Sequence, residues 1–261
     1  MPAVTDSLLE CRNCAAGYGG RDVFSGLELD IRPGRTIAVV GPSGCGKSTL
    51  LLTLAGLHRP SAGEVLFHGR PLGELAPRIG LVLQQYGLFP WFTVLRNAML
   101  GLEIRARRAR QRFDARTSAE AAQHMLARLG LRGKEHDYPR RLSGGEQQRL
   151  ALCRTLLLDP EVLLLDEPFS ALDALTREEL QDLLLGLLRE RGVANLLVTH
   201  SIDEAVYLGD ELGILAAAGS GPARLVLEAN PAGGRGVPRT DPRHHAAGAW
   251  MRRRFEELAR A

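Results

Sequence analysis

The chain has 261 residues, of which 45% are hydrophobic, which is typical of one large domain with or without a smaller lobe. Lys and Arg number 33 and Asp and Glu 30, so the charge excludes no class of protein but gives no argument for binding nucleic acid. No apolar run reaches the roughly 18–20 residues that span a bilayer, and the N-terminal MPAVTDSLLE lacks the pattern of an export signal. We therefore expect a protein of the cytosol or of the cytosolic face of a membrane.

The first predicted element is a strand at 8–18, LLECRNCAAGY, which holds an isolated C-x-x-C pair. That spacing occurs in zinc and redox sites, but a metal site needs further ligands and the sequence has no second pair. Along a regular strand, Cys11 and Cys14 would point to opposite faces. We therefore expect neither metal nor redox chemistry there, and we expect Cys45 and Cys153 to be ordinary small buried residues.

A continuously apolar run, TIAVV at 36–40, predicts a strand that is buried on both faces. It leads into GPSGCGKST at 41–49, which matches G-x-x-x-x-G-K-[ST] and precedes a helical pattern. The glycines allow a tight curl that turns backbone N–H groups onto a phosphate, and the helix adds its positive N-terminal end. We expect Lys47 to reach the β- and γ-phosphates of a nucleotide and Ser48 to bind Mg²⁺. A plain glycine-rich turn would require neither the lysine nor this spacing.

The segment QQYGLFPWFTV at 84–94 gathers Tyr86, Phe89, Trp91 and Phe92, although aromatic residues are only 5% of the chain. A glycine and a proline within it exclude one regular helix or strand. The rings are either packed in the core or exposed as a patch for a partner, and the segment by itself favours neither interpretation.

A region at 93–131 that is rich in Ala, Arg and Leu predicts helices, and it contains the basic run RARRARQR at 105–112. Most such runs are solvated faces. Contact with anionic lipid headgroups is the alternative, in which each arginine near the membrane surface would contribute about 1 kcal/mol.

The segment LSGGEQQR at 142–149 opens the next predicted helix. Ser143 and Glu146 match the S-x-x-E capping box, which explains part of the pattern. Capping does not explain Gly144 and Gly145, because glycine costs up to about 1 kcal/mol relative to alanine inside a helix. A helix N-terminus without side chains suits the close approach of an anion. We therefore predict a second phosphate-binding end, far along the chain from the first.

Two further apolar runs end in polar groups. EVLLLDE at 161–167 delivers Asp166 and Glu167, and NLLVTH at 195–200 delivers His200. Open α/β sheets bind ligands at the carboxyl ends of their strands, so these groups are expected beside the phosphate loop. There Asp166 would hold Mg²⁺, Glu167 would orient and deprotonate water, and His200 would contact water or the γ-phosphate. The alternatives are solvated acids at a turn and an ordinary structural histidine.

The remaining sequence predicts that the core ends near residue 228. Residues 229–245, ANPAGGRGVPRTDPRHH, are rich in Gly, Pro and Arg and predict a loose linker. The following WMRRRFEELARA, at 250–261, predicts a short terminal helix.

The phosphate loop, LSGGEQQR and SALD at 170–173 together make the chain similar to the ATP-binding cassette (ABC) ATPases over about residues 8–228. The resemblance implies an α/β fold of the P-loop NTPase type, with a mostly parallel sheet core, an antiparallel β part and an inserted helical lobe at about 93–141. It also implies one ABC ATPase domain over residues 1–228, followed by the linker and helix at 229–261. In that family two cassettes pair head to tail, and each ATP lies between one chain's Walker A loop, to which residues 41–49 are similar, and the other's LSGGE stretch. SALD is similar to the D-loop, which faces the partner cassette. A bare P-loop kinase or GTPase would leave LSGGE and SALD unexplained.

The resemblance also implies a role for each motif residue. Asp166 is similar to the Walker B aspartate, Glu167 to the catalytic carboxylate, and Gln84 to the glutamine that contacts Mg²⁺ and senses the γ-phosphate. Tyr18 is similar to the aromatic residue that stacks on adenine, with a turn tyrosine in GYGG as the alternative. The implied catalytic residues are Glu167, His200 and Gln84, and the implied Mg²⁺ ligands are Ser48, Gln84 and Asp166. The implied ATP-binding residues are Tyr18, Gly41, Pro42, Ser43, Gly44, Cys45, Gly46, Lys47, Ser48, Thr49, Ser143, Gly144, Gly145 and Glu146.

Finer resemblance indicates the ATP-hydrolysing subunit of a membrane importer. LFPWFTVLRNAMLGL, HSIDEAVYLGD and VPRTDPR are similar to segments of the nitrate, sulfonate and taurine importer group, while LGILAAAGSGPARLVLE departs from its usual pattern. The implied partners are a two-copy permease, a second ATPase subunit forming a homodimer and, indirectly, a solute-binding protein, with no nucleic acid. The implied location is peripheral, on the cytoplasmic side of the inner membrane. An exporter ATPase and a soluble, non-transport ABC ATPase are the alternatives.

Within this resemblance the aromatic segment divides into two parts. Gln84 belongs to the ATP site, and the loop after it lines a groove that receives a coupling helix of the permease. Phe89, Trp91 and Phe92 are therefore the implied interface residues, and we expect at least one of these rings to pack between the two lobes.

Overall fold

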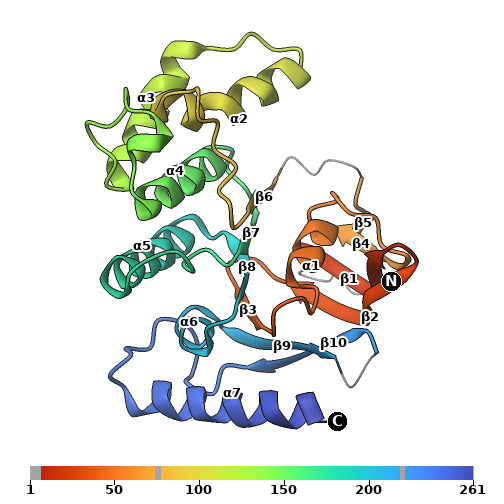
Figure 1. Cartoon of the computed structure of the whole chain (residues 1–261). Helices are drawn as coiled ribbons and strands as arrows, with labels where there is room; N and C mark the ends of the chain where they lie inside the picture. The colour runs from red at the N-terminus through yellow and green to blue at the C-terminus, as the bar shows by residue number, and fades with distance from the viewer. Residues whose placement is uncertain (1–6, 74–77, 218–220, 261) are drawn as a thin grey trace.

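The computed structural model describes residues 7–73, 78–217 and 221–260, so residues 218–220 of the segment LGILAAAGSGPARLVLE lie outside the described residues. Within them, ten strands form one sheet in the order β5-β4-β1-β2-β10-β9-β3-β8-β7-β6 (Figure 1). The strands are β1 (Leu9–Tyr18), β2 (Arg21–Ile31), β3 (Thr36–Val40), β4 (Ala62–Phe67), β5 (Arg70–Pro71), β6 (Ile79–Val82), β7 (Val162–Asp166), β8 (Ala194–Thr199), β9 (Glu211–Ala217) and β10 (Ala223–Ala229).

The sheet has a parallel part and an antiparallel part. Strands β9, β3, β8, β7 and β6 pair parallel with one another in that order. Strand β1 pairs antiparallel with β2 and β4, and β10 pairs antiparallel with β9. The three strands predicted from continuous apolar runs, β3, β7 and β8, are buried at every residue, as expected for a sheet that is covered on both faces. The predicted α/β fold with a mostly parallel core and an antiparallel part is confirmed.

Helices cover the sheet and also form a lobe of their own. They are α1 (Lys47–Leu54), α2 (Val94–Arg108), α3 (Ala115–Arg128), the 3₁₀ helix η1 (Pro139–Arg141), α4 (Gly144–Leu156), α5 (Ala174–Arg191), α6 (Ile202–Leu208) and α7 (Pro242–Arg260). In Figure 1 the lobe of α2, α3 and α4 lies at the top, and α7 lies at the opposite end, where it packs against α6 and β9. Of the described helices, none combines the length and apolar character that crossing a membrane requires.

Two hydrophobic cores lie on opposite faces of the sheet, and the alternation along each strand assigns side chains to one or the other. In β3, Ala38 and Val40 belong to the core shared with the helical lobe, α5, α6 and α7. Ile37 and Val39 belong to the core shared with β1, β2 and α1. Strand β3, which leads into the phosphate loop, is therefore held from both sides.

Strand β1 is irregular at the C-x-x-C pair. Asn13 has a left-handed φ of 48°, and the pairing register shifts between Cys11 and Cys14. Both cysteines are consequently buried in the same core, and the Cys14 thiol donates a hydrogen bond to the Glu64 carbonyl at 3.2 Å. The prediction of opposite faces is wrong because a bulge breaks the alternation of a regular strand. Cys45 and Cys153 are buried, as predicted.

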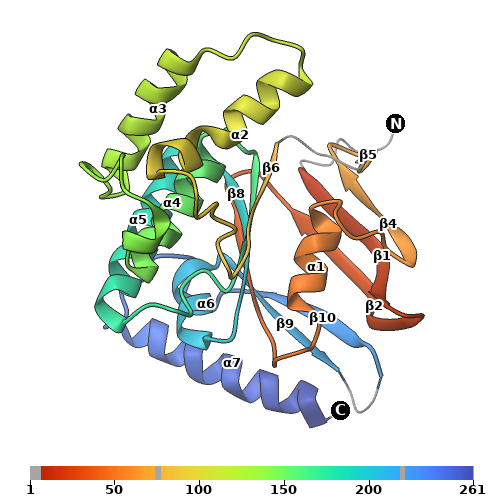
Figure 2. The same cartoon turned by 45° about the horizontal axis from the view of Figure 1, so that its top comes forward.

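The segment at 229–245 is anchored, which corrects the prediction of a loose linker. The Arg235 guanidinium donates to the Thr36 hydroxyl and to the Gly34 carbonyl, each at 2.7 Å. The Arg239 guanidinium lies 3.7 Å from the centre of the Tyr207 ring. The terminal helix is also longer than predicted, because α7 begins at Pro242 and has 19 residues (Figure 2). The domain boundary at residue 228 stays a prediction.

Candidate nucleotide-binding site

The phosphate loop joins β3 to α1. Its Gly44 and Gly46 have φ values of 80° and 104°, a left-handed backbone that favours glycine. A Cβ on Gly41 would lie 2.5 Å from the Leu215 carbonyl oxygen, so the strand can pass β9 only with glycine there. The Lys47 ammonium donates to the Gly41 and Pro42 carbonyls at 2.8 and 3.0 Å and is thus folded over the loop.

A pocket of about 490 Å³ lies beside this loop and collects most of the predicted site residues. Val23, which the sequence did not single out, also lines it. The predicted residues that line it are Tyr18, Ser43, Gly44, Gly46, Lys47, Ser48, Thr49, Gln84, Asp166 and Glu167. The pocket therefore joins segments that are up to 149 residues apart in sequence, from Tyr18 to Glu167.

Asp166 and Glu167 lie at the carboxyl end of β7, close to the phosphate loop. Asp166 is only 6% exposed; burial raises the pKa of its carboxyl, while a hydrogen bond from Ser48 opposes that rise. Glu167 leaves the strand with a left-handed φ of 45°, and its side chain is 18% exposed. Neither residue is the well-solvated acid of an ordinary strand-end turn.

Glu167 lies between the Lys47 ammonium and the His200 imidazole. Its Oε1 lies 3.6 Å from the Lys47 Nζ, and its Oε2 lies 3.1 Å from the His200 Nδ1. His200 itself is not a buried structural residue, because its side chain is 61% exposed and it lies outside the lining of the pocket. The arrangement sets a carboxylate at the pocket wall with an imidazole beside it, where both can act on water at the pocket mouth.

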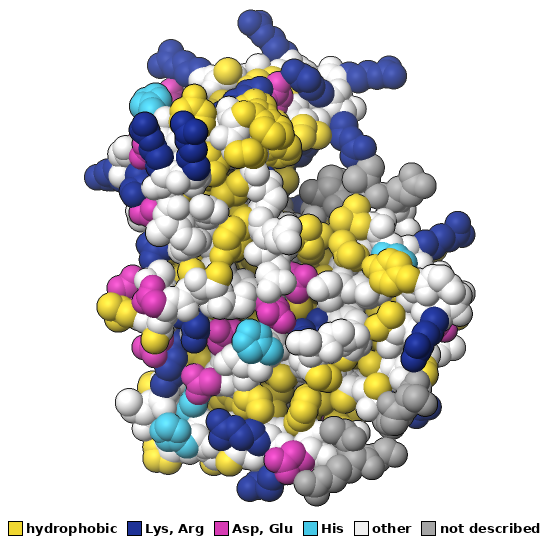
Figure 3. Space-filling model, in the orientation of Figure 1, with side chains coloured by type: hydrophobic (Ala, Val, Ile, Leu, Met, Phe, Trp, Pro, Cys, Tyr) yellow, Lys and Arg dark blue, Asp and Glu magenta, His cyan; other side chains and the backbone are white. Residues whose placement is uncertain are grey.

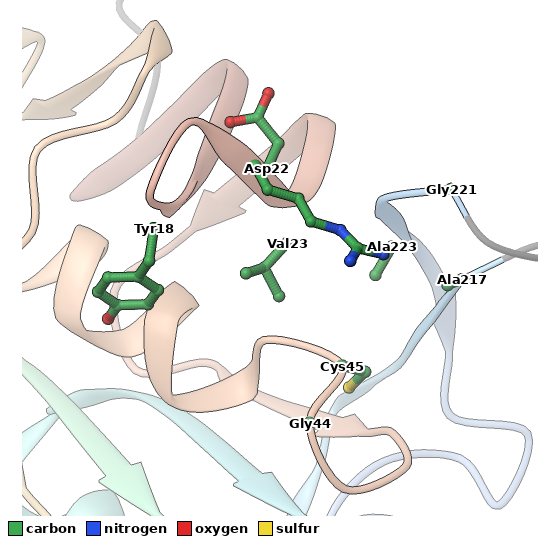
Figure 4. Close-up of a pocket in the computed structure, with 9 residues that line it drawn as sticks. Tyr18, Asp22, Val23, Gly44, Cys45, Ala217, Gly221 and Ala223 are labelled. Carbon is green, nitrogen blue, oxygen red and sulfur yellow. The ribbon is translucent and has the colours of Figure 1, made fainter.

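A second, smaller pocket of about 320 Å³ adjoins the first and shares Tyr18, Val23 and Gly44 with it. In Figure 4, Tyr18 borders one side of this hollow, and Cys45 lies across from it on the phosphate loop. The Tyr18 side chain is 57% exposed, and its ring centre lies 4.8 Å from that of His58. An exposed ring beside two hollows fits a flat ligand better than it fits a simple turn residue.

The LSGGE stretch is separate from both pockets. Ser143 caps α4, and both hydrogen bonds of the predicted capping box with Glu146 are present, at 2.9 and 3.3 Å. A Cβ on Gly145 would lie 2.8 Å from the Thr176 methyl group, so packing against α5 explains this glycine. A Cβ on Gly144 would meet its nearest neighbour only at 3.8 Å, so Gly144 alone remains unexplained by packing.

The aromatic segment follows Gln84, and its backbone is fixed by two polar side chains that the sequence did not single out. The Asn97 side chain, fully buried in α2, accepts from the Phe89 amide at 2.8 Å and donates to the Phe89 and Phe92 carbonyls at 3.0 Å. The Arg154 guanidinium of α4 donates to the Tyr86 and Gly87 carbonyls at 2.8 and 2.7 Å. No local pattern could identify these anchors, because their partners are backbone amide and carbonyl groups.

The rings of this segment separate into two groups. Tyr86 packs against the core that the two lobes share. Phe89, Trp91 and Phe92 contact one another, with ring centres 5.6 to 6.3 Å apart, and Trp91 is 67% exposed. The segment thus contributes Tyr86 to the core and carries an apolar cluster on the surface. None of the three cluster rings belongs to either hydrophobic core, so the expectation that one of them packs between the lobes is not met.

The basic run at 105–112 is only partly a free surface. The Arg105 guanidinium donates to the Leu158 carbonyl at 2.9 Å, and Arg107 forms an ion pair with Glu103 at 2.7 Å. Lys and Arg side chains nevertheless project around the rim of the helical lobe (Figure 3). The solvated face and contact with anionic lipid headgroups both stay predictions for this run.

Comparison with known proteins adds a family match. The family described as ABC transporter matches residues 24–170, more than half of the chain. The aliphatic sulfonates import ATP-binding protein SsuB of Bacillus subtilis (strain 168) is 46% identical over 195 residues, which cover 75% of this chain and 73% of that protein. The taurine import ATP-binding protein TauB of Yersinia pestis bv. Antiqua (strain Antiqua) is 43% identical over 211 residues, covering 81% and 79%.

Solved structures show the same fold. The dimeric structure of MJ0796, a bacterial ABC transporter cassette, is 31% identical with a TM-score of 0.71, covering 79% of this chain and 94% of that one. A second dimeric structure of MJ0796, in a post-hydrolysis state bound to ADP and Pi, is 29% identical with a TM-score of 0.74, covering 85% and 98%.

Proposed function

Because this chain belongs to the ABC transporter family, and its relatives include sulfonate and taurine import proteins, we propose that it is the ATP-hydrolysing subunit of an importer for sulfonate-like small solutes. It would act as a peripheral subunit on the cytoplasmic side of the inner membrane. The observation that carries the proposal is the single pocket in which the phosphate loop, Gln84 and the Asp166–Glu167 pair meet. The import relatives favour this function over an exporter or a soluble ABC protein.

In the proposed reaction, this chain's residues bind the triphosphate and prepare water. The loop amides and Lys47 bind phosphate oxygens, for which the lysine exchanges its present bonds to two loop carbonyls. Glu167 accepts the proton of the attacking water, and His200 holds that water or the γ-phosphate.

The donor set also fits Mg²⁺. Ser48, Gln84 and Asp166 bring a hydroxyl, an amide and a carboxylate to one wall of the pocket, and these oxygen donors suit a hard cation whose other ligands are phosphate oxygens and water. When bound, Mg²⁺ would neutralise charge that develops on the phosphates.

The proposed site is completed by a second copy of the chain. Ser143, Gly144 and Glu146 open α4 but line neither pocket of their own chain, so their anion-binding end faces elsewhere. Two copies paired head to tail would set this end against the partner's nucleotide, and the MJ0796 cassette is itself dimeric.

The adenine platform can be tested apart from the phosphate site. Tyr18→Ala is expected to raise the Kd for ATP about tenfold, because stacking on an aromatic ring contributes roughly 1–3 kcal/mol per base. Calorimetry with ATP, and with inorganic tripolyphosphate as a ligand without a base, measures the difference. Tyr138→Ala removes another exposed tyrosine and is the matched control. If Tyr18→Ala weakened the binding of ATP and of tripolyphosphate equally, the stacking role would be contradicted.

The permease contact can be tested through the exposed ring cluster. Trp91→Ala is expected to weaken binding of the chain to its permease about tenfold or more, because exposed aromatic anchors dominate such interfaces. Co-purification with the permease from membranes measures binding, and phosphate release measures ATP turnover of the isolated chain, which should stay within about twofold of wild type. Leu57→Ala, also an exposed apolar side chain, is the control. Equal loss of turnover and stability would make Trp91 a packing residue.

The whole proposal is tested by co-purifying the chain with its membrane partner and binding protein. ATP hydrolysis by the reconstituted complex should rise when the binding protein is loaded with taurine or an alkanesulfonate. Stimulation by an unrelated solute alone would overturn the solute class, and the absence of ATP hydrolysis would overturn the proposed function.

A further inference from the structure

Arg177, one turn into α5, fixes the segment that connects β7 to that helix. Its Nε donates to the Phe169 carbonyl at 3.3 Å and its Nη2 to the Leu172 carbonyl at 2.6 Å. The Phe169 carbonyl directly precedes SALD at 170–173, and the Leu172 carbonyl lies within it. In the head-to-tail pair of the proposed function, SALD would face the partner copy. The Arg177 guanidinium therefore binds the backbone of the segment that a partner copy would contact.

Glu204 of α6 pairs with the same guanidinium and connects it to Thr199 at the end of β8. Its Oε1 lies 3.6 Å from the Arg177 Nε, and its Oε2 accepts a hydrogen bond from the Thr199 hydroxyl at 2.6 Å. Glu204 is 6% exposed, and burial raises the pKa of its carboxyl, an effect that the Thr199 bond and Arg177 oppose. Loss of Arg177 or of the Thr199 hydroxyl would leave the buried Glu204 carboxyl with one polar contact fewer, which is unfavourable.

Thr199 connects this acid to the backbone on both sides of His200. Its hydroxyl donates to Glu204 and accepts from the Ser201 amide at 3.0 Å. Thr199 also pairs in the sheet with Val40, the residue before the phosphate loop. The His200 side chain is 61% exposed and contacts Glu167 through Nδ1, so packing constrains it little. The hydrogen bonds of Thr199 therefore hold the backbone segment that carries it.

We propose that Arg177, Glu204 and Thr199 form a positioning relay that places His200 against Glu167 according to the position of the SALD segment. Docking of a partner at SALD moves the carbonyls that Arg177 holds, and the relay passes that displacement to the residues beside the imidazole. The relay rests on the proposed function, because it assumes that Glu167 and His200 carry out hydrolysis in a paired state.

Thr199→Val tests the relay because it removes one hydroxyl and keeps the side-chain shape. In the purified full-length chain, kcat for ATP hydrolysis should fall about tenfold with KM within about twofold, since misplacing a catalytic group lowers kcat while nucleotide binding is untouched. Thr199→Ser restores the hydroxyl and should bring kcat back to within about twofold of wild type. In a Glu167→Gln background, Thr199→Val should still form the ATP-bound dimer on size exclusion.

Thr155→Val is the matched control. Thr155 is a buried threonine in α4 whose hydroxyl donates to the Ala151 carbonyl at 3.0 Å, away from His200. It should keep kcat within about twofold of wild type, which separates loss of positioning from a general loss of stability. Equal kcat for Thr199→Val and Thr155→Val, or no recovery in Thr199→Ser, would overturn the relay.

Arg177→Met tests the relay at the end opposite to Thr199, so the proposal stays testable even if Thr199→Val does not fold. Arg177 is part-exposed, and its replacement should lower kcat several-fold, about as much as Glu204→Gln, with KM unchanged. The double variant Arg177→Met with Thr199→Val should lower kcat no further than the worse single variant, because the effects of residues that act through one another are not additive. Additive effects would overturn the relay.

The proposed function is judged separately in the same assay. Wild-type turnover that disappears in Glu167→Gln supports the function even if the relay fails, whereas no wild-type turnover would remove the function and the relay together.

Discussion

Replacing Glu167 with glutamine is expected to lower ATP turnover at least about a hundredfold, because an amide cannot accept the proton of the attacking water. The change keeps the size of the side chain at a site between Lys47 and His200. ATP should still bind, and two copies should remain closed around it. Phosphate release measures turnover, and size exclusion with and without ATP measures the dimer.

The matched control lies at the start of the same strand. Glu161 precedes β7 and forms ion pairs with Arg78 and His68 at 2.9 Å, far from the pocket. Glu161→Gln should leave turnover within about twofold of wild type, because the two ion pairs that it weakens are remote from the pocket residues. Wild-type turnover in Glu167→Gln would show that another group is the base.

The second large effect is expected in the C-terminal helix. Met251→Ala should lower the free energy of unfolding by about 2–4 kcal/mol, because it empties a buried position that is 0% exposed in the core shared with α5 and α6. Urea denaturation followed by circular dichroism measures the change. ATP turnover at temperatures where the variant remains folded should be unaffected, since α7 does not line the pocket.

Two variants bracket this result. Met251→Leu keeps most of the volume and should cost less than about 1.5 kcal/mol. Arg253→Ala, at an exposed position of the same helix, should change stability by no more than about 0.5 kcal/mol. If Met251→Ala were as mild as Arg253→Ala, the packing of α7 on the core would contribute little to stability.

The parts of the fold that the sequence predicts correctly depend on local patterns. Strands β3, β7 and β8 are continuous apolar runs, and their polar ends gather at one edge because parallel strands share it. The ends of β3 and β7 line the pocket, and His200 at the end of β8 lies beside Glu167 but outside the lining. The roles of those polar residues stay predictions until they are measured.

The parts that the sequence misses depend on contacts between distant residues. In the sequence, Arg235 and Arg239 look like linker residues. Only the structure shows that Arg235 donates to the Thr36 hydroxyl and that Arg239 stacks on the Tyr207 ring. Gly145 looks like a ligand-binding glycine until Thr176, 31 residues later, fills the space above it. In β1, a single left-handed residue, Asn13, reverses the side on which Cys14 lies.

Helix α4 carries a consequence for how force crosses the molecule. Its Ser143 cap opens LSGGE, and its Arg154 holds the Tyr86 and Gly87 carbonyls beside the ring cluster, about 16 Å further along the axis. A helix of this length resists bending, so the ends that carry Ser143 and Arg154 are expected to move together as parts of one rigid element. We therefore expect a displacement of the ring cluster to reach LSGGE as a rotation of the whole helix, without a rotamer change in any side chain between them.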